Sequence, residues 1–226
     1  MKADEVKTFT AKWGYAPTRI AVAMDALVML VHKSNPIKEL KIEQLDAVWS
    51  STRLQGWPND IQTWGELGLT NANWNARPIV RIGRPEGSGI RDFFREAVEL
   101  GGKGKTDTKH SEDAMGLMEE ILANQAAMGY GSLGEVVSNM RAIPLIPKGG
   151  KTAVEPSATT VTDGSYPLSR VIYIYLNRAP GKPLDPHLVK FMRFVLSKDG
   201  QKQVKLNGLV PLPDDLIAMN LRRIGQ

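Results

Sequence analysis

The residue types with the most chemical potential lie in a glycine-rich turn between two regular segments. The turn and the start of the next segment read Gly83-Arg84-Pro85-Glu86-Gly87-Ser88-Gly89-Ile90-Arg91. Ser88 can cap the following helix with its hydroxyl group, while Gly89 lets a ligand approach the backbone. The N–H groups of the first helical turn favour an anion, to which Arg84 and Arg91 could donate charge-assisted hydrogen bonds. An ordinary capped turn with two solvated arginines is the alternative.

Asp25 interrupts the apolar run at residues 20–31. A buried carboxylate without a partner is costly, so Asp25 must reach a hydrogen-bond donor, a cation or a protonated ligand oxygen. It either satisfies backbone donors at a strand end or accepts the proton of a bound, protonated oxyanion. The sequence leaves both readings open.

Three other groups of residues carry weaker signals. Gly104-Lys105-Thr106 looks like the end of a phosphate-binding P-loop, but Glu99 stands where that motif needs glycine, so the segment is predicted to be a solvated basic loop. The three histidines are far apart in the sequence, and we expect no metal site. They are His32, His110 and His187. The five tryptophans are expected to pack in the interior, because no basic residues interleave with them as in a nucleic-acid surface.

Composition bounds the class of protein. The chain has 226 residues, a formal net charge of +5 and no cysteine, which excludes disulfides, thiolate metal sites and cysteine nucleophiles. The length fits one large domain or two small ones. The longest apolar run, residues 20–31, is too short to span a membrane, and residues 1–5 lack the apolar stretch of a secretory signal. No nucleophile–base arrangement is indicated.

Hydrophobic patterning predicts an α/β fold. The continuous apolar run at residues 20–31 is typical of a strand buried on both faces. Helices are predicted at 42–49, from 90 to Gly101, at 114–122 behind Ser111 as cap, after Asp185-Pro186, and at 201–206. Strands are predicted at 78–82, 127–130, 142–146 and 171–176, and Pro211 and Pro213 are expected to end regular structure. A Gly/Pro/Ser/Thr-rich connection at 147–167 suggests that the chain passes between two lobes.

Four stretches in one order resemble a known family. They are Val22-Ala23-Met24-Asp25-Ala26-Leu27 with His32-Lys33-Ser34-Asn35-Pro36-Ile37; Gly83 through Phe94; Tyr166-Pro167-Leu168-Ser169-Arg170; and Gly200-Gln201 with Gly208-Leu209-Val210-Pro211-Leu212-Pro213. Together they resemble the phosphate-binding proteins of bacterial ABC phosphate uptake systems, within the type II periplasmic binding protein superfamily. The resemblance covers most of the chain.

The resemblance implies a two-lobed clamp that captures phosphate and delivers it to an ABC transporter permease, without catalysis and without a cofactor. The location implied is the periplasm or the cell exterior, with membrane contact only through the permease or a lost anchor, and no nucleic-acid partner is expected. Carried over residue by residue, Ser88 and Gly89 would donate to the anion, Arg84 and Arg91 would supply charge, and Asp25 would accept the ligand's proton.

The sequence also departs from the family pattern. At Ile90 the family usually has threonine, so one hydroxyl donor is missing while the backbone N–H remains. Family members have a further N-terminal part, so this chain is expected to start in mid-domain. Residues 34–165 would then form one complete lobe, and residues 1–33 with 166–226 a partial one.

Two other functions remain open. The departures make a non-transport interaction or sensory module the alternative function. The anion-binding turn also leaves room for a hydrolase or transferase acting on phosphate esters, although nothing else in the sequence points to one.

Overall fold

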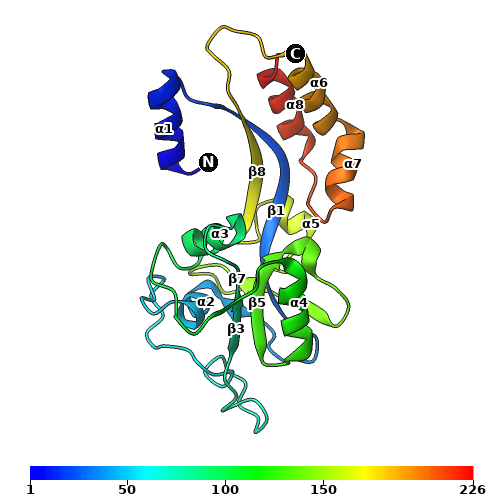
Figure 1. Cartoon of the computed structure of the whole chain (residues 1–226). Helices are drawn as coiled ribbons and strands as arrows, with labels where there is room; N and C mark the ends of the chain where they lie inside the picture. Colours follow the sequence, from blue (N-terminus) through cyan, green and yellow to red (C-terminus); the bar gives the residue numbers. More distant parts are fainter. Residues whose placement is uncertain (226) are drawn as a thin grey trace. The chain divides into compact units, whose positions relative to one another are not determined.

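The computed structural model describes residues 1–225 and divides the chain into two compact units (Figure 1). Unit 1 comprises Met1–Asp25 and the described residues from Arg170 on, and unit 2 is Ala26–Ser169. The predicted boundaries, after residues 33 and 165, lie several residues away from these. Strand pairing explains the difference, because residues 27–32 pair with β5 and β6 of unit 2 and Leu27 N–H donates to Leu168 O at 3.0 Å.

The apolar run forms the long strand β1 (Thr18–His32), as predicted. Its second half joins the sheet of unit 2, where it lies antiparallel between β5 (Ala127–Ser132) and β6 (Met140–Ile143). Strand β3 (Val80–Gly83) pairs parallel with β5 on one side and with β4 (Lys109–His110) on the other. The sheet is therefore mixed, and β1 is buried along nearly its whole length because elements cover both faces.

Unit 2 also contains helices. Their bounds are α2 (Ile42–Trp49), α3 (Gly89–Ala97), α4 (Ala114–Ala123) and α5 (Ala158–Thr162), with a 3-10 turn η1 at Leu133–Glu135. Neighbouring strand residues point to opposite faces. A Cβ at Gly129 would lie 3.0 Å from Ile121 of α4, whereas the ring of Tyr130 stacks on Phe94 of α3. Helices α4 and α3 therefore pack on opposite faces of β5. The short strands β2 (Leu40–Lys41) and β7 (Leu145–Ile146) pair parallel beside α2.

Unit 1 combines the first half of β1 with β8 (Ser169–Leu176) and four helices. The helices are α1 (Ala3–Trp13), α6 (Pro186–Val195), α7 (Lys198–Leu206) and α8 (Asp214–Arg223). Two buried amides join helices to β1. Gln201 donates from Nε2 to Val22 O at 3.0 Å, and Asn220 accepts from Ala21 N–H at 3.1 Å.

The α/β class is confirmed, but several local predictions need correction. Pro213 does not end regular structure: it is the N-terminal cap residue of α8, because a proline with extended backbone can precede a helix that begins with acidic residues. The cap of α4 is Asp113, whose Oδ1 accepts from Gly116 N–H at 2.9 Å, and Ser111 is not the cap. Helix α1 was not predicted, and none of its residues is buried. Within residues 1–225, no helix has the length and apolar character needed to cross a membrane.

Phe94 tests the packing of α3 on the sheet. Its side chain is fully buried and lies parallel to the ring of Tyr130, with 4.1 Å between ring centroids. Phe94→Ala should lower the free energy of unfolding by about 3–5 kcal/mol, through lost burial and the cavity left behind. Urea unfolding followed by tryptophan fluorescence measures the change, with exposed Phe191→Ala as the control. Equal, small losses in both variants would contradict the packing described.

Candidate functional site

The glycine-rich turn forms the N-terminal end of α3, as predicted. The Ser88 hydroxyl accepts from the backbone N–H of Arg91 at 3.3 Å, so the predicted cap is confirmed. Gly87 has a φ of +84°, a left-handed conformation that glycine adopts without strain. A Cβ built at Gly89 would meet no heavy atom within 4 Å. The space in front of the first helical turn is therefore open to a ligand.

Arg91 points its charge into the protein. Its side chain is largely buried, and Nε donates to Glu86 at 2.9 Å while Nη1 donates to the buried Glu99 at 2.8 Å. Burial alone would lower the pKa of Arg91, but the hydrogen bond and negative charge of Glu99 outweigh it and raise that pKa. The alternative of two solvated arginines is therefore wrong for Arg91, whose hydrogen bonds serve to hold α3 in place.

Arg84 differs from Arg91 in having unused donors. Its backbone is fixed on both sides: the N–H donates to the Tyr130 hydroxyl at 3.2 Å, and the carbonyl oxygen lies 3.0 Å from His110 Nδ1. The Nε and Nη1 atoms of its guanidinium are enclosed, yet no acceptor for either lies among residues 1–225. Leaving charged donors enclosed without acceptors costs free energy. An anion bound here would supply those acceptors.

Aromatic packing holds Tyr130 in the position from which it contacts Arg84. The Tyr130 ring lies parallel to Phe94, and Trp49 packs edge-on against both, with centroid distances of 5.1 Å to Tyr130 and 5.4 Å to Phe94. Burial raises the pKa of the Tyr130 hydroxyl, which keeps it in the neutral form. Sequence reasoning missed Tyr130, because no local pattern reveals a contact between residues 46 positions apart.

A cavity of about 160 Å³ adjoins this cluster and is lined by Trp49, Tyr130, Arg91 and Glu99 among others. Its charged wall residues already have opposite partners: Arg91 pairs with Glu86 and Glu99, and Lys105 pairs with Asp60. The cavity therefore offers no uncompensated positive charge. The unpaired donors of Arg84 make the turn the better place for an anion.

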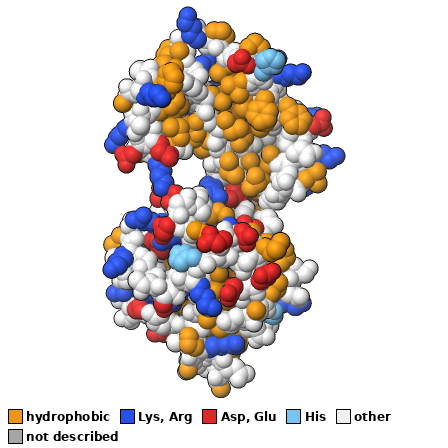
Figure 2. Space-filling view, in the orientation of Figure 1, with side chains coloured by type: hydrophobic (Ala, Val, Ile, Leu, Met, Phe, Trp, Pro, Cys, Tyr) orange, Lys and Arg blue, Asp and Glu red, His pale blue; other side chains and the backbone are white. Residues whose placement is uncertain are grey.

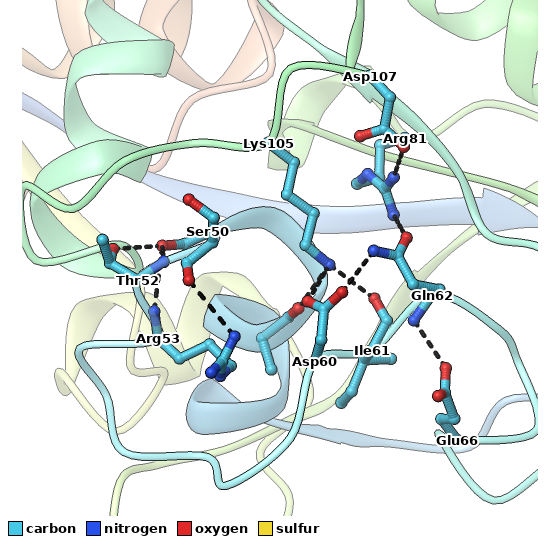
Figure 3. A network of polar contacts seen from close by, with 12 residues as sticks. Ser50, Thr52, Arg53, Asp60, Ile61, Gln62, Glu66, Arg81, Lys105 and Asp107 are labelled. Carbon is cyan, nitrogen blue, oxygen red and sulfur yellow. Dashed lines mark hydrogen bonds and ion pairs between the residues drawn. The ribbon is translucent and has the colours of Figure 1, made fainter.

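The Lys105 segment corrects a prediction. Figure 3 shows Lys105 reaching into a polar network, where Nζ donates to Ile61 O at 2.8 Å and to Ala47 O at 2.9 Å and pairs with Asp60 at 2.6 Å. The segment is thus not a solvated loop at Lys105, whose side chain is 7% exposed. Burial lowers the pKa of Lys105. With three partners on its ammonium group, Lys105 fastens the loop that follows α2.

The same network fixes the rest of that loop. Buried Arg81 donates to Gln62 Oε1 at 3.3 Å and pairs with Asp107, while Glu66 accepts from the N–H of Gln62 at 2.7 Å (Figure 3). Three of the five tryptophans are buried, as predicted, whereas the prediction is wrong for Trp13, which is 44% exposed, and Trp57 is only partly buried. The three buried tryptophans are Trp49, Trp64 and Trp74.

Asp25 belongs to unit 1, whereas the other five predicted site residues belong to unit 2. Its carboxylate is 2% exposed and accepts from Arg170, at 2.9 Å from Nη2 and 3.2 Å from Nε. Of the partners that the sequence allowed, the structure supplies a cation on the neighbouring strand. That ion pair accounts for the burial of Asp25 without a ligand.

Ile90, half-buried in the first turn of α3, contributes no side-chain donor. No cluster of three or more metal-ligating side chains occurs within the described chain.

Glu86, Glu99 and His110 were not predicted to support the turn. In the sequence, Glu86 and Glu99 are marked only by a charge opposite to that of Arg91, and His110 only by its place in a strand. Neither feature is specific enough to predict the contact.

Comparison with known proteins assigns the chain to a family. Residues 1–199 match the family described as the PBP superfamily domain. Over 225 residues the chain is 37% identical to the phosphate-binding protein PstS of Pseudomonas aeruginosa, covering 100% of this chain and 69% of the relative. The chain belongs to the PstS family of the PBP superfamily. A more distant PstS, from Staphylococcus saprophyticus, is 29% identical over 217 residues, covering 94% of this chain and 63% of that protein.

Solved structures carry the same fold as this PstS family member. A possible phosphate binding protein from Planctomyces limnophilus superposes with a TM-score of 0.74 at 23% identity, covering 99% of this chain and 76% of that one. An ABC-type phosphate transport receptor from Vibrio cholerae gives a TM-score of 0.69 at 21% identity, covering 87% and 73%. These likenesses establish the fold.

In this PstS family member, Asp46 of α2 offers a test of the electrostatics beside the site. Its carboxylate is fully buried: Oδ2 accepts from Gln55 N–H at 2.6 Å, and Oδ1 has no hydrogen-bond partner among the described residues. Burial raises its pKa above the ordinary 3.8. The folded state therefore holds this proton more tightly than the unfolded state, and stability falls as pH rises through the folded pKa.

We accordingly expect wild type to lose stability relative to Asp46→Asn as pH rises. The two proteins have all other titratable groups in common, so the pH dependence of the difference between their free energies of unfolding reports on Asp46 alone. A pH-independent effect of the amide shifts this difference by a constant and does not change its pH dependence. Urea titrations at a series of pH values from 3.5 to 7 measure it. Parallel curves for the two proteins would show that burial does not perturb Asp46.

Proposed function

We propose that this chain binds inorganic phosphate, or a similar oxyanion, and delivers it to the permease of an ABC transporter. The observation that carries the proposal is the pair of enclosed, unpartnered donors on Arg84, four residues before the Ser88-capped start of α3. Membership of the PstS family supports the choice of anion. The alternative of a non-transport module is not favoured, since the PstS relatives are named for phosphate binding.

Within this site the residues have separate roles. Arg84 donates from its guanidinium to the anion, and Ser88, Gly89 and Ile90 bring the N-terminal turn of α3 and its dipole to the same oxygens. Ser88 keeps its hydroxyl proton available for the ligand, because that hydroxyl accepts its bond from Arg91 N–H. Arg91 acts as a positioning residue.

The site is proposed to bind without catalysis. Tight binding of an oxyanion requires many fixed hydrogen-bond donors and the exclusion of water. Because the bound oxyanion is not chemically changed, the site requires no nucleophile and no proton relay. Asp25 is proposed to stabilise the pairing of β1 and β8 through its ion pair with Arg170, which uses Oδ2. Its predicted role as acceptor of the ligand's proton stays a prediction, because a carboxylate can accept at both oxygens. We place the protein in the periplasm or outside the cell, where such a receptor meets its permease.

Thermal unfolding tests the binding proposal. A ligand that binds only the folded state raises the unfolding midpoint as its concentration exceeds Kd. We expect millimolar phosphate to raise the midpoint of the 226-residue chain above the midpoint measured in chloride at matched ionic strength. A chain that unfolds cooperatively and shows no phosphate-specific rise would contradict the proposal.

Paired arginine variants test the division of roles. Arg84→Gln should weaken phosphate binding about ten- to a hundred-fold, the usual worth of hydrogen bonds to a charged group, with little loss of stability. Arg91→Gln should instead lower the free energy of unfolding, because it strips Glu99 of its buried partner. Calorimetric titration and urea unfolding of both variants separate the two effects. The reverse pattern would assign the ligand to Arg91.

A further inference from the structure

A groove of about 470 Å³ in unit 1 is lined by α7, by the connection that follows it and by the first turn of α8. Its apolar wall consists of Leu196, Pro211, Leu212 and Ile217. Leu196 and Leu212 are buried, whereas Pro211 and Ile217 remain partly exposed. The groove, which we call the α7–α8 groove, therefore presents apolar surface that the fold leaves accessible.

Buried Gln201 of α7 holds the walls of this groove in place. Its Oε1 accepts from the backbone N–H of Leu212 at 2.8 Å, and its Nε2 donates to Val195 O at 2.9 Å. These bonds tie the connection after α7 to α7 itself and to the end of α6. Because the groove is already formed in the folded chain, a partner that enters it loses little affinity to rearrangement.

Three lysines line the α7 side of the groove. Lys198, Lys202 and Lys205 are spaced i, i+4 and i+7, so they share one face of the helix in a row about 10 Å long. All three are exposed, and none forms an ion pair with another residue of the described chain. Leu206, at the end of α7, is 68% exposed. Figure 2 shows basic and hydrophobic side chains close together along the edge of unit 1 that α7 forms.

The spacing of the charges indicates what kind of partner fits. A single carboxylate or phosphate is too small to reach three ammonium groups spread along two turns of helix. An amphipathic helix with acidic residues at the same i, i+4, i+7 spacing matches the whole row and places an apolar stripe against the wall beside it. Asp214, the first residue of α8, also lines the groove. Its carboxylate would repel an acidic residue there, so the acidic side of the partner must lie over α7.

We propose that the α7–α8 groove binds an amphipathic, acidic helix of another polypeptide. The acidic residues of that helix pair with Lys198, Lys202 and Lys205, and its apolar residues pack against Leu212 and Ile217. Apolar burial supplies most of the affinity, while the exposed ion pairs select an acidic partner and set its orientation. The proposal goes beyond phosphate binding and does not depend on it.

A designed peptide tests the proposal. It carries glutamates at i, i+4 and i+7 and leucines on the adjacent stripe, and a side-chain lactam on its outer face locks the helix. Fluorescence anisotropy measures its binding to the 226-residue chain. We expect saturable binding that weakens as salt is added, because exposed charges are screened. The same peptide with glutamines in place of the glutamates should bind more weakly.

Charge reversal places the peptide in the groove. Lys202→Glu should weaken binding about ten-fold, because it replaces attraction with repulsion in the middle of the row. Replacing the central glutamate of the peptide with lysine should restore binding to this variant. Lys38→Glu, the same change at an exposed lysine of unit 2, should bind the original peptide like wild type.

Four results would overturn the proposal. They are the absence of saturable binding at millimolar peptide, equal affinity of wild type and Lys202→Glu, a homo-oligomer of the chain alone that Lys202→Glu dissociates, and binding to phosphatidylglycerol vesicles that the same variant abolishes. The third would assign the groove to a second copy of the chain, and the fourth to a lipid surface. Phosphate is absent throughout, so failure here is distinct from failure of the proposed function.

Discussion

The buried ion pair between Arg91 and Glu99 is the constraint on which the candidate site depends. Loss of one partner of a buried pair costs about 3–5 kcal/mol, because it leaves an uncompensated charge. The pair spans the length of α3 and lies next to the stacked rings of Phe94 and Tyr130. Since Tyr130 also accepts from the backbone N–H of Arg84, the same cluster that anchors the helix fixes the turn before it. Contacts within the protein therefore hold the turn in place whether or not a ligand is bound.

This arrangement separates two arginines that look equivalent in the sequence. Both flank the same glycine-rich turn, and both could serve an anion. Arg91 is satisfied by two carboxylates, whereas two nitrogens of Arg84 are enclosed without an acceptor in the described chain. A satisfied ion pair stabilises the fold, while unused donors favour a ligand. Sequence could not distinguish them, because the decisive partner of Arg91 lies eight residues further along.

The elements that the sequence predicted well are those with a strong local pattern. The apolar run of β1 and the capped start of α3 needed no long-range information. Helix α8 was missed because Pro213 was interpreted as a terminator, although the acidic residues after it are typical of a helix start. The partner of Asp25, Arg170, is 145 positions away, and only strand pairing brings the two together. Burial of Lys105 likewise depends on carbonyl groups from two distant segments.

The central claim is that Arg84, supported by Tyr130, holds the anion, while Arg91 supports the fold. Arginine side-chain Nε–H signals in a ¹⁵N-labelled chain report on each guanidinium separately. On titration with phosphate, the Arg84 signal should move and the Arg91 signal should stay in place, with neither moving in chloride at matched ionic strength. Movement of Arg91 with Arg84 unchanged, or no movement of either at saturating phosphate, would contradict the account.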